Sequence, residues 1–337
     1  MSITEKRGAD KPLRMPGKII DRPLLRQVSP KDAKWDDRAG ERDKVRDLYR
    51  GTLYDVLAGK IQGCSGHLEF AWGFDAQNVP RLKLRSAWFC RVRYCPVCQW
   101  RKSLIWRARA FKTIPKICEA YPSHRWLALT LTIRNCEIQD LRATLGKMGK
   151  AWTRLTKFPQ WPATGWLRSV EVTRGKDGTA HPHYHCLLLV PSTYFGRNYL
   201  NQKEWEALWQ QALRIDYPPN VHITAITGKK GKGKESIPIA GAILETLQYS
   251  VKPSDLVQDQ DWLVELTTQM KNLRAIATGG VLREFFKELD KEPEDLIHVD
   301  ENAEQEVEDI CSVYFDWEEK YKHYVLQEDE EENMMDI

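Results

Sequence analysis

The sequence predicts an α+β protein with a mainly antiparallel sheet, helices packed on one face and a small cysteine-rich unit. Three observations support this class. Residues 126–134 alternate apolar and polar side chains with a period of two, residues 141–155 repeat apolar side chains at helical spacing, and four cysteines lie between residues 64 and 98. With 337 residues, the chain can form one large domain with appendages or two domains, and it can bury a sizeable core.

The other elements follow from the same two periodicities and from turn signals. The helix over 141–155 ends before Phe158-Pro159, and the turn GKDG at 175–178 separates two strands. We expect strands over residues 126–134, 165–173, 181–190 and 221–227, and helices over residues 97–116, 141–155, 202–214, 240–251, 260–273 and 282–289.

Composition divides the chain into four segments. Residues 1–48 are polar and mixed in charge, which indicates a mobile N-terminal arm. Residues 49–120 form the cysteine-rich unit, and residues 121–289 form the main α+β domain. Residues 290–337 are an acidic tail, either a solvated and partly disordered segment or a mimic of nucleic acid that the basic body binds.

The charge is distributed unevenly. The chain has 51 Lys and Arg against 47 Asp and Glu, a net charge of +4. Residues 290–337 carry a net charge of −16, so the preceding residues carry +20. A basic body of this size favours a polyanionic partner.

The sequence indicates a soluble, cytoplasmic protein without a membrane partner. The longest purely aliphatic run near the middle, Leu187–Val190, is far shorter than the roughly 20 residues of a membrane helix. The N-terminus has basic residues but no apolar segment behind them, so it does not resemble a secretory signal. In the cytoplasm, the eight cysteines are expected to be reduced or metal-bound.

Three histidines occupy alternate positions of one expected strand. His181, His183 and His185 therefore point to the same side, and imidazole is a common metal ligand. Pro182 cannot donate to a strand ladder, so we favour His183 and His185 as ligands of a catalytic ion, with His181 as a possible third. Glu171 on the preceding strand is the nearest candidate carboxylate. The alternative is three polar residues on the open face of an edge strand.

A carboxylate, a phenol and an ammonium share one face of the helix expected over residues 240–251 and its end. Glu245, Tyr249 and Lys252 follow one another at helical spacing. Taken alone, this is an ordinary amphipathic helix. Beside a metal site, Tyr249 can attack a phosphodiester, Lys252 can offset the developing charge and Glu245 can activate a water. The combination favours phosphodiester transfer over acyl or hydride chemistry.

The cysteines have the spacing of a zinc knuckle. Cys90, Cys95 and Cys98 end in a CxxC pair, and Cys64 can complete a four-thiolate set, with His67 as a rival fourth ligand. We expect structural Zn²⁺, while a redox pair and unligated buried thiols are the alternatives.

Two basic segments are candidates for DNA contact. In residues 99–112, basic side chains interleave with aromatic ones, which suits phosphate contacts and base stacking. The loop GKKGKGKE at 228–235 nearly fits a phosphate-binding loop, but Glu235 replaces the required hydroxyl residue. The candidate DNA-binding residues are Arg101, Lys102, Arg107, Arg109, Lys229, Lys230, Lys232 and Lys234.

Four motifs carry a resemblance to a known family over about residues 64–290. HPHYHCLLL at 181–189 resembles the histidine strand of the HUH endonucleases. ETLQYSVK at 245–252, LALTLTIRN at 127–135 and CRVRYCPVCQWRK at 90–102 resemble the rolling-circle plasmid replication initiators that pair one Tyr with a Glu.

The resemblance implies an HUH-like sheet and a nickase that acts on single-stranded or hairpin plasmid origin DNA. It implies that Tyr249 attacks the scissile phosphate, stays linked to the 5′ phosphate and leaves a 3′ hydroxyl primer. By the same resemblance, His183 and His185 hold Mg²⁺ or Mn²⁺, and Glu245 directs the water that ends the cycle. A host helicase and polymerase are the implied partners.

Two other functions fit the same residues. One is a mobilisation relaxase or single-strand transposase of the same superfamily. The other is a non-catalytic, zinc-dependent regulator that binds DNA without cleaving it, and binding without cleavage would distinguish it.

Overall fold

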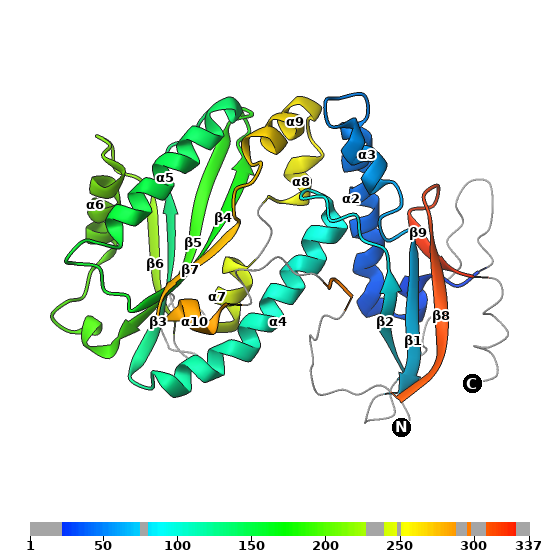
Figure 1. The fold of residues 1–337 in the computed structure, drawn as a ribbon, viewed down its shortest axis with the longest axis horizontal. Helices are drawn as coiled ribbons and strands as arrows, with labels where there is room; N and C mark the ends of the chain where they lie inside the picture. Colours follow the sequence, from blue (N-terminus) through cyan, green and yellow to red (C-terminus); the bar gives the residue numbers. More distant parts are fainter. Residues whose placement is uncertain are drawn as a thin grey trace, which may run out of the picture.

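The computed structural model describes residues 22–74, 80–226, 239–247, 251–287, 295–297 and 308–327. Within these residues, the chain forms two antiparallel sheets, and the long helix α4 (Pro96–Ala120) runs from one to the other (Figure 1). None of the described helices is long and apolar enough to cross a membrane.

The larger sheet has the strand order β6-β3-β5-β4-β7, and each neighbouring pair is antiparallel. Its strands are β3 His124–Thr132, β4 Gly165–Arg174, β5 Ala180–Pro191, β6 Val221–Ile226 and β7 Ile276–Gly280. The predicted α+β class with an antiparallel sheet is confirmed.

Helices cover both faces of the larger sheet. Tyr184, Cys186 and Leu188 of β5 belong to one hydrophobic cluster with α5 and α6, whereas Leu187 and Leu189 belong to a second cluster with α4, α7 and α10. These elements are α5 Leu141–Leu155, α6 Gln202–Leu213, α7 Ile239–Thr246 and α10 Leu282–Phe285. The expected helix layer is therefore joined by a second layer on the opposite face.

The smaller sheet has the order β2-β1-β8-β9 and combines strands from both ends of the chain (Figure 1). Its strands are β1 His67–Phe74, β2 Pro80–Ala87, β8 Glu308–Glu318 and β9 His323–Leu326. The remaining elements are α1 Leu25–Val28, α2 Lys34–Tyr49, α3 Asp55–Ile61, α8 Pro253–Leu256 and α9 Gln260–Gln269, with the 3-10 turns η1 Pro30–Ala33, η2 Ile138–Asp140 and η3 Ser192–Phe195.

The expectation of a mobile arm is wrong for residues 34–48, because they belong to the packed helix α2. Trp35 is 1% exposed, and its ring meets that of Trp100 edge to face at 4.9 Å between centroids. The sequence is misleading here because charged residues of α2 are buried together with their partners. Arg42 donates to Asp43 from both Nε and Nη2, at 3.0 and 2.7 Å.

The expectation of a solvated acidic tail is wrong for residues 308–326, because they form β8 and β9. Two carboxylates of α2 bind these strands. Asp36 accepts a hydrogen bond from the Tyr324 amide at 2.8 Å, and Asp43 accepts from Trp317 Nε1 and Lys322 Nζ, each at 3.0 Å. Helix α2 and the last two strands therefore stabilise each other.

We predict that Trp35→Ala lowers the free energy of unfolding by about 3–5 kcal/mol, because it leaves a large cavity between α2 and α4. Urea unfolding followed by circular dichroism measures this change. Trp88→Ala is the matched control, since Trp88 is 56% exposed and its loss should have little effect. Equal losses in the two variants would contradict the packing of α2.

Candidate functional site

One face of the larger sheet is divided into an apolar half and a polar half along β5. Leu187 and Leu189 are buried under α4, α7 and α10. His183 and His185 precede them on the same face, since side chains of a strand alternate. The apolar half anchors the helices, and the polar half presents nitrogen and oxygen atoms beside them.

A row of polar side chains crosses the sheet at His185. Thr130 of β3 lies opposite His185 in the β3–β5 pair and opposite His222 in the β3–β6 pair. Ser169 of β4 lies opposite His185 on the remaining side. Thr130, Ser169 and His222 are not among the predicted site residues, although the alternation of β3 places Thr130 on a polar face.

Glu171, His183 and His185 form a group that can hold a metal ion. One ligand atom from each lies within 4.8 Å of the others. Glu171 is directly opposite His183 in the β4–β5 pair, and its Oε2 is 3.7 Å from His183 Nδ1 and 2.7 Å from His185 Nε2. The His183 Nε2 atom is buried without a hydrogen-bond partner. Two imidazoles and one carboxylate leave coordination positions for water and substrate oxygen.

Burial and charge act against each other at this group. Burial favours neutral Glu171, but hydrogen bonds from His183 and His185 outweigh it and lower the pKa of Glu171 to about 2. Burial likewise favours neutral His185, but hydrogen bonds to Glu171 and Glu245 raise its pKa to about 9. A metal ion that binds His185 must therefore displace a proton.

His181 lies beside this group rather than in it. Its ring meets that of His183 edge to face at 4.1 Å between centroids. Burial and the neighbouring His183 lower the pKa of His181. His181 also lines a cavity of about 460 Å³ together with Tyr217 and Asn220. His181 is therefore placed to contact a molecule bound at the polar half of the sheet.

Glu245 reaches the same group from α7. Its Oε1 is 3.5 Å from His185 Nδ1, and the side chain is 45% exposed. Buried Ile243 and Leu247 anchor α7 on the apolar half of the sheet. The hydrogen bond to His185 lowers the pKa of Glu245, so the carboxylate is ionised at neutral pH.

The predicted catalytic helix was also expected to carry Tyr249 and, at its end, Lys252. Helix α7 ends at Thr246, and Tyr249 lies outside the described residues. Lys252 is exposed and forms the N-cap of α8. The basic loop with Lys229, Lys230, Lys232 and Lys234 also lies outside the described residues.

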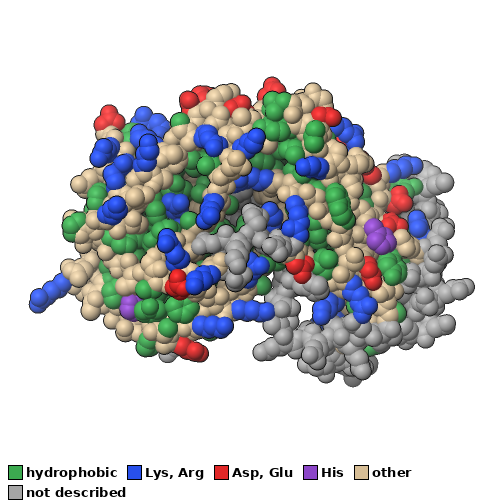
Figure 2. Space-filling view, in the orientation of Figure 1, with side chains coloured by type: hydrophobic (Ala, Val, Ile, Leu, Met, Phe, Trp, Pro, Cys, Tyr) green, Lys and Arg blue, Asp and Glu red, His purple; other side chains and the backbone are tan. Residues whose placement is uncertain are grey.

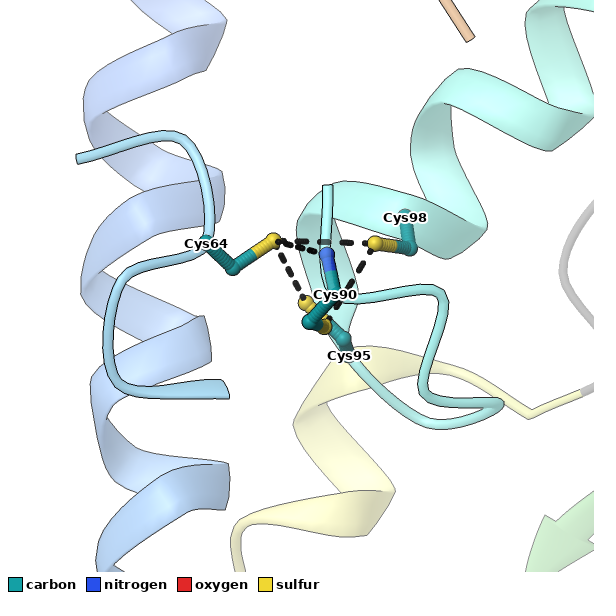
Figure 3. Close-up of side chains that lie close together, drawn as sticks. All are labelled: Cys64, Cys90, Cys95 and Cys98. Atoms are coloured by element: carbon teal, nitrogen blue, oxygen red, sulfur yellow. Dashed lines mark hydrogen bonds between the residues drawn. The ribbon is translucent and has the colours of Figure 1, made fainter. Parts of the chain in front are cut away.

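The four predicted cysteines converge at the start of α4 (Figure 3). The Sγ atom of Cys64 is 3.6 Å from those of Cys95 and Cys98, and the Cys90 Sγ is 3.7 Å from that of Cys98. Thiolates bound at about 2.3 Å to a tetrahedral zinc ion lie about 3.8 Å apart. The spacing therefore fits a four-thiolate zinc site.

The structure separates Cys64 from its rival His67. His67 is half-exposed, hydrogen-bonds Asp316 at 2.8 Å and stacks on Tyr314. It therefore lies at the start of β1, outside the cysteine group. Hydrogen bonds from Cys64 and the other two thiols lower the pKa of Cys98, so one thiol of the group ionises readily.

Comparison with known proteins identifies the family of the chain. The replication protein family matches residues 81–325. The chain belongs to this family. It is 34% identical over 320 residues to "Protein rep" of Lentilactobacillus hilgardii, covering 91% of this chain and 100% of the relative. It is 32% identical over 308 residues to "Protein rep" of Lactiplantibacillus plantarum, covering 87% and 95%.

A third relative covers less of the chain. It is "Protein rep" of Streptococcus pneumoniae serotype 2, 33% identical over 267 residues, which are 77% of this chain and 80% of the relative. No solved structure matches the chain. The resemblance to replication initiators that the sequence motifs carry is confirmed at the level of the family.

The basic residues of α4 have different environments in this replication protein. Arg101 is only 7% exposed and donates to the carbonyl oxygens of Leu296 and Ile297 at 2.8 and 2.6 Å. Its selection as a DNA contact is wrong, because it holds the 295–297 segment against α4. Lys102, Arg107 and Arg109 are partly exposed. Lys and Arg side chains border the hollow between the two sheets on the face shown in Figure 2.

We predict that the purified protein holds one tightly bound zinc ion and that Cys64→Ser loses it, since three thiolates leave the tetrahedral set incomplete. Metal analysis by mass spectrometry measures the zinc content, and we expect the free energy of unfolding to fall by at least about 2 kcal/mol. His67→Ala is the control and should keep the zinc. Zinc loss from His67→Ala with retention in Cys64→Ser would reverse the assignment.

Proposed function

We propose that the chain initiates rolling-circle replication of a plasmid by nicking one strand of origin DNA through a covalent link to Tyr249. The observation that carries this proposal is the 3.5 Å approach of Glu245 to His185 of the Glu171–His183–His185 group. Tyr249 follows Glu245 by four residues, so we expect its phenol to act at the same group.

The ligand set suits a divalent ion such as Mn²⁺ or Mg²⁺, because it combines imidazole nitrogens with a carboxylate. When bound, the ion polarises the scissile phosphate and offsets its charge. Glu171 would be a ligand of the ion and would also orient the other two ligands. It contacts both His183 and His185 and thereby holds both imidazole rings in place. The partly covered position of the group, beside α7, restricts water around the phosphate.

In the first step, the phenol oxygen of Tyr249 attacks the phosphorus, and the bond from phosphorus to the 3′ oxygen breaks. The phenol proton passes to the leaving oxygen, which becomes a 3′ hydroxyl, while the 5′ phosphate stays on the tyrosine. Lys252 is three residues further on and offsets the charge that develops on the phosphate. A host polymerase extends the 3′ hydroxyl, with a host helicase opening the duplex.

In the closing step, Glu245 accepts a proton from a water that attacks the tyrosyl phosphate. The bond between phosphorus and the phenol oxygen breaks, and the phenol regains a proton. The lowered pKa of Glu245 supports this role, because the carboxylate is ionised before the water arrives. A structural zinc ion in the cysteine group would keep α4 in place during both steps.

We predict that Tyr249→Phe binds origin DNA as the wild type does but forms no covalent adduct, because the attacking oxygen is missing. The experiment incubates the protein and single-stranded DNA with Mn²⁺, followed by peptide mass spectrometry. Tyr217→Phe is the matched control, since Tyr217 lines the cavity beside His181 and is the rival nucleophile.

The outcomes of this experiment separate the candidate functions. An adduct that persists in Tyr249→Phe and disappears in Tyr217→Phe would move the nucleophile to Tyr217. Binding of origin DNA without an adduct or a nick in the wild type would favour the non-catalytic regulator.

We predict that Glu245→Gln still nicks DNA but hydrolyses the tyrosyl phosphate about 100-fold more slowly, because an amide cannot take the proton of water. Single-turnover release of labelled DNA measures this rate. Glu284→Gln on α10 is the control, since this exposed carboxylate pairs with Lys287 and is not part of the group. Release at the wild-type rate from Glu245→Gln would remove Glu245 from the closing step.

A further inference from the structure

A second cavity, of about 800 Å³, lies between the cysteine unit and the larger sheet. It is bounded by the 90–94 loop, by α3 and the end of α2, by α4, and by residues 267–276. This volume is within the range that holds small ligands. Two of the predicted site residues, the DNA-contact candidate Lys102 and the zinc ligand Cys90, line it, and the residues of the proposed reaction do not.

The described lining is cationic and contains no carboxylate. Its basic residues are Lys60, Arg91, Arg93, Lys102, Lys271 and Arg274. Lys60, Lys271 and Arg274 are exposed, and none of these three forms an ion pair with any other part of the described chain. Arg93 instead holds the wall, because its Nη1 donates to the carbonyl oxygens of Met270 and Leu273. The rim therefore suits a polyanion.

The inner wall contains polar atoms that lack partners. Gln99 is 7% exposed, and neither its amide nitrogen nor its amide oxygen makes a hydrogen bond to any residue that the structure describes. Trp106 lies seven residues further along the same face of α4, and its Nε1 also lacks a partner. Each buried polar group left unpaired costs about 1–3 kcal/mol. A ligand that pairs these groups recovers this free energy.

The cavity adjoins the candidate metal group. Ser169 and Ile276 line it, and they lie opposite each other in the β4–β7 pair. Ser169 is also directly opposite His185 in the β4–β5 pair, where facing side chains are about 5 Å apart. A strand whose phosphate lies at the histidines can therefore place a neighbouring nucleotide in the cavity.

We propose that this cavity binds one unstacked nucleotide of single-stranded DNA, with the Gln99 amide hydrogen-bonded to the edge of the base. An amide offers one acceptor and a donor pair, which complement the adjacent groups on a base edge. Tyr54 and Trp106 supply rings against which the base packs, and Lys60, Lys271 and Arg274 contact the flanking phosphates. The proposal rests on the proposed function, because the nicking reaction brings single-stranded DNA to the protein.

The test compares two labelled probes by fluorescence anisotropy with the full-length protein. One probe is a 12-residue deoxyadenosine strand, and the other is a 12-residue abasic strand with the same phosphates. We expect Gln99→Leu to lower the affinity for the deoxyadenosine probe about tenfold, because the base contact is lost. The affinity for the abasic probe should not change, since that probe has no base. Lys271→Ala should lower the affinity for both probes by the same factor. It should also reduce the slope of log affinity against log salt concentration by about one, because one phosphate contact is lost.

Folding is not expected to limit this test. Leu is close to Gln in size and removes two unpaired polar atoms, so the thermal midpoint and zinc content should not fall. Gln99→Met provides a second substitution of the same length with the same expected result.

Two results would overturn the proposal. The first is that both Gln99 variants bind the two probes with the wild-type affinity. The second is that they lose affinity for both probes by the same factor. In either case the cavity does not hold a base. A Tyr249 adduct in the same preparation would then leave the proposed function standing without the pocket. Failure of the wild type to bind either probe would also overturn the pocket, whereas the proposed function is decided by the Tyr249 adduct.

Discussion

Strand β5 is constrained on every side, because it is hydrogen-bonded to β3 and β4 and faces helices above and below. Its even-numbered residues must fit α5 and α6. Its odd-numbered residues change from histidine to leucine at one point, between His185 and Leu187. The leucines bind α7 to the sheet, so Glu245 arrives beside His185 as a consequence of ordinary hydrophobic packing. A one-residue slip of β5 would turn the histidines toward α5 and α6 and remove the ligand group.

The cysteine group performs a similar task for α4. Cys95 caps this helix and Cys98 lies in its first turn, while Cys64 and Cys90 come from loops next to the smaller sheet. One ion bound by all four would tie the start of α4 to that sheet. The same helix carries Gln99 and Trp106 into the cavity and packs its far end against the larger sheet. Metal binding at this group would therefore determine how α4 presents its basic and aromatic residues.

Elements with a clean periodicity were predictable, and elements governed by distant partners were not. The helix over 141–155 has the expected bounds because its apolar stripe is uninterrupted. Strand β7 was missed because it ends in Gly279 and Gly280, which weaken a strand signal. Both glycines are required: a Cβ on Gly279 would meet the Trp166 ring at 2.3 Å, and Gly280 has φ +59°. Strand β8 was missed because acidic residues surround the buried Val313 and Phe315.

The candidate site likewise contains residues that the sequence could predict and residues that it could not. Strand spacing could predict that His183 and His185 share a side, and a single turn between β4 and β5 made Glu171 a reasonable partner. Spacing alone could not predict that Arg101 is buried by the 295–297 segment, since that contact joins residues almost 200 positions apart. The same limit applies to Gln99. In the sequence it is only a polar residue after a cysteine. Its proposed contact with a ligand depends on the structure, which places its buried, unpaired amide in a cationic cavity.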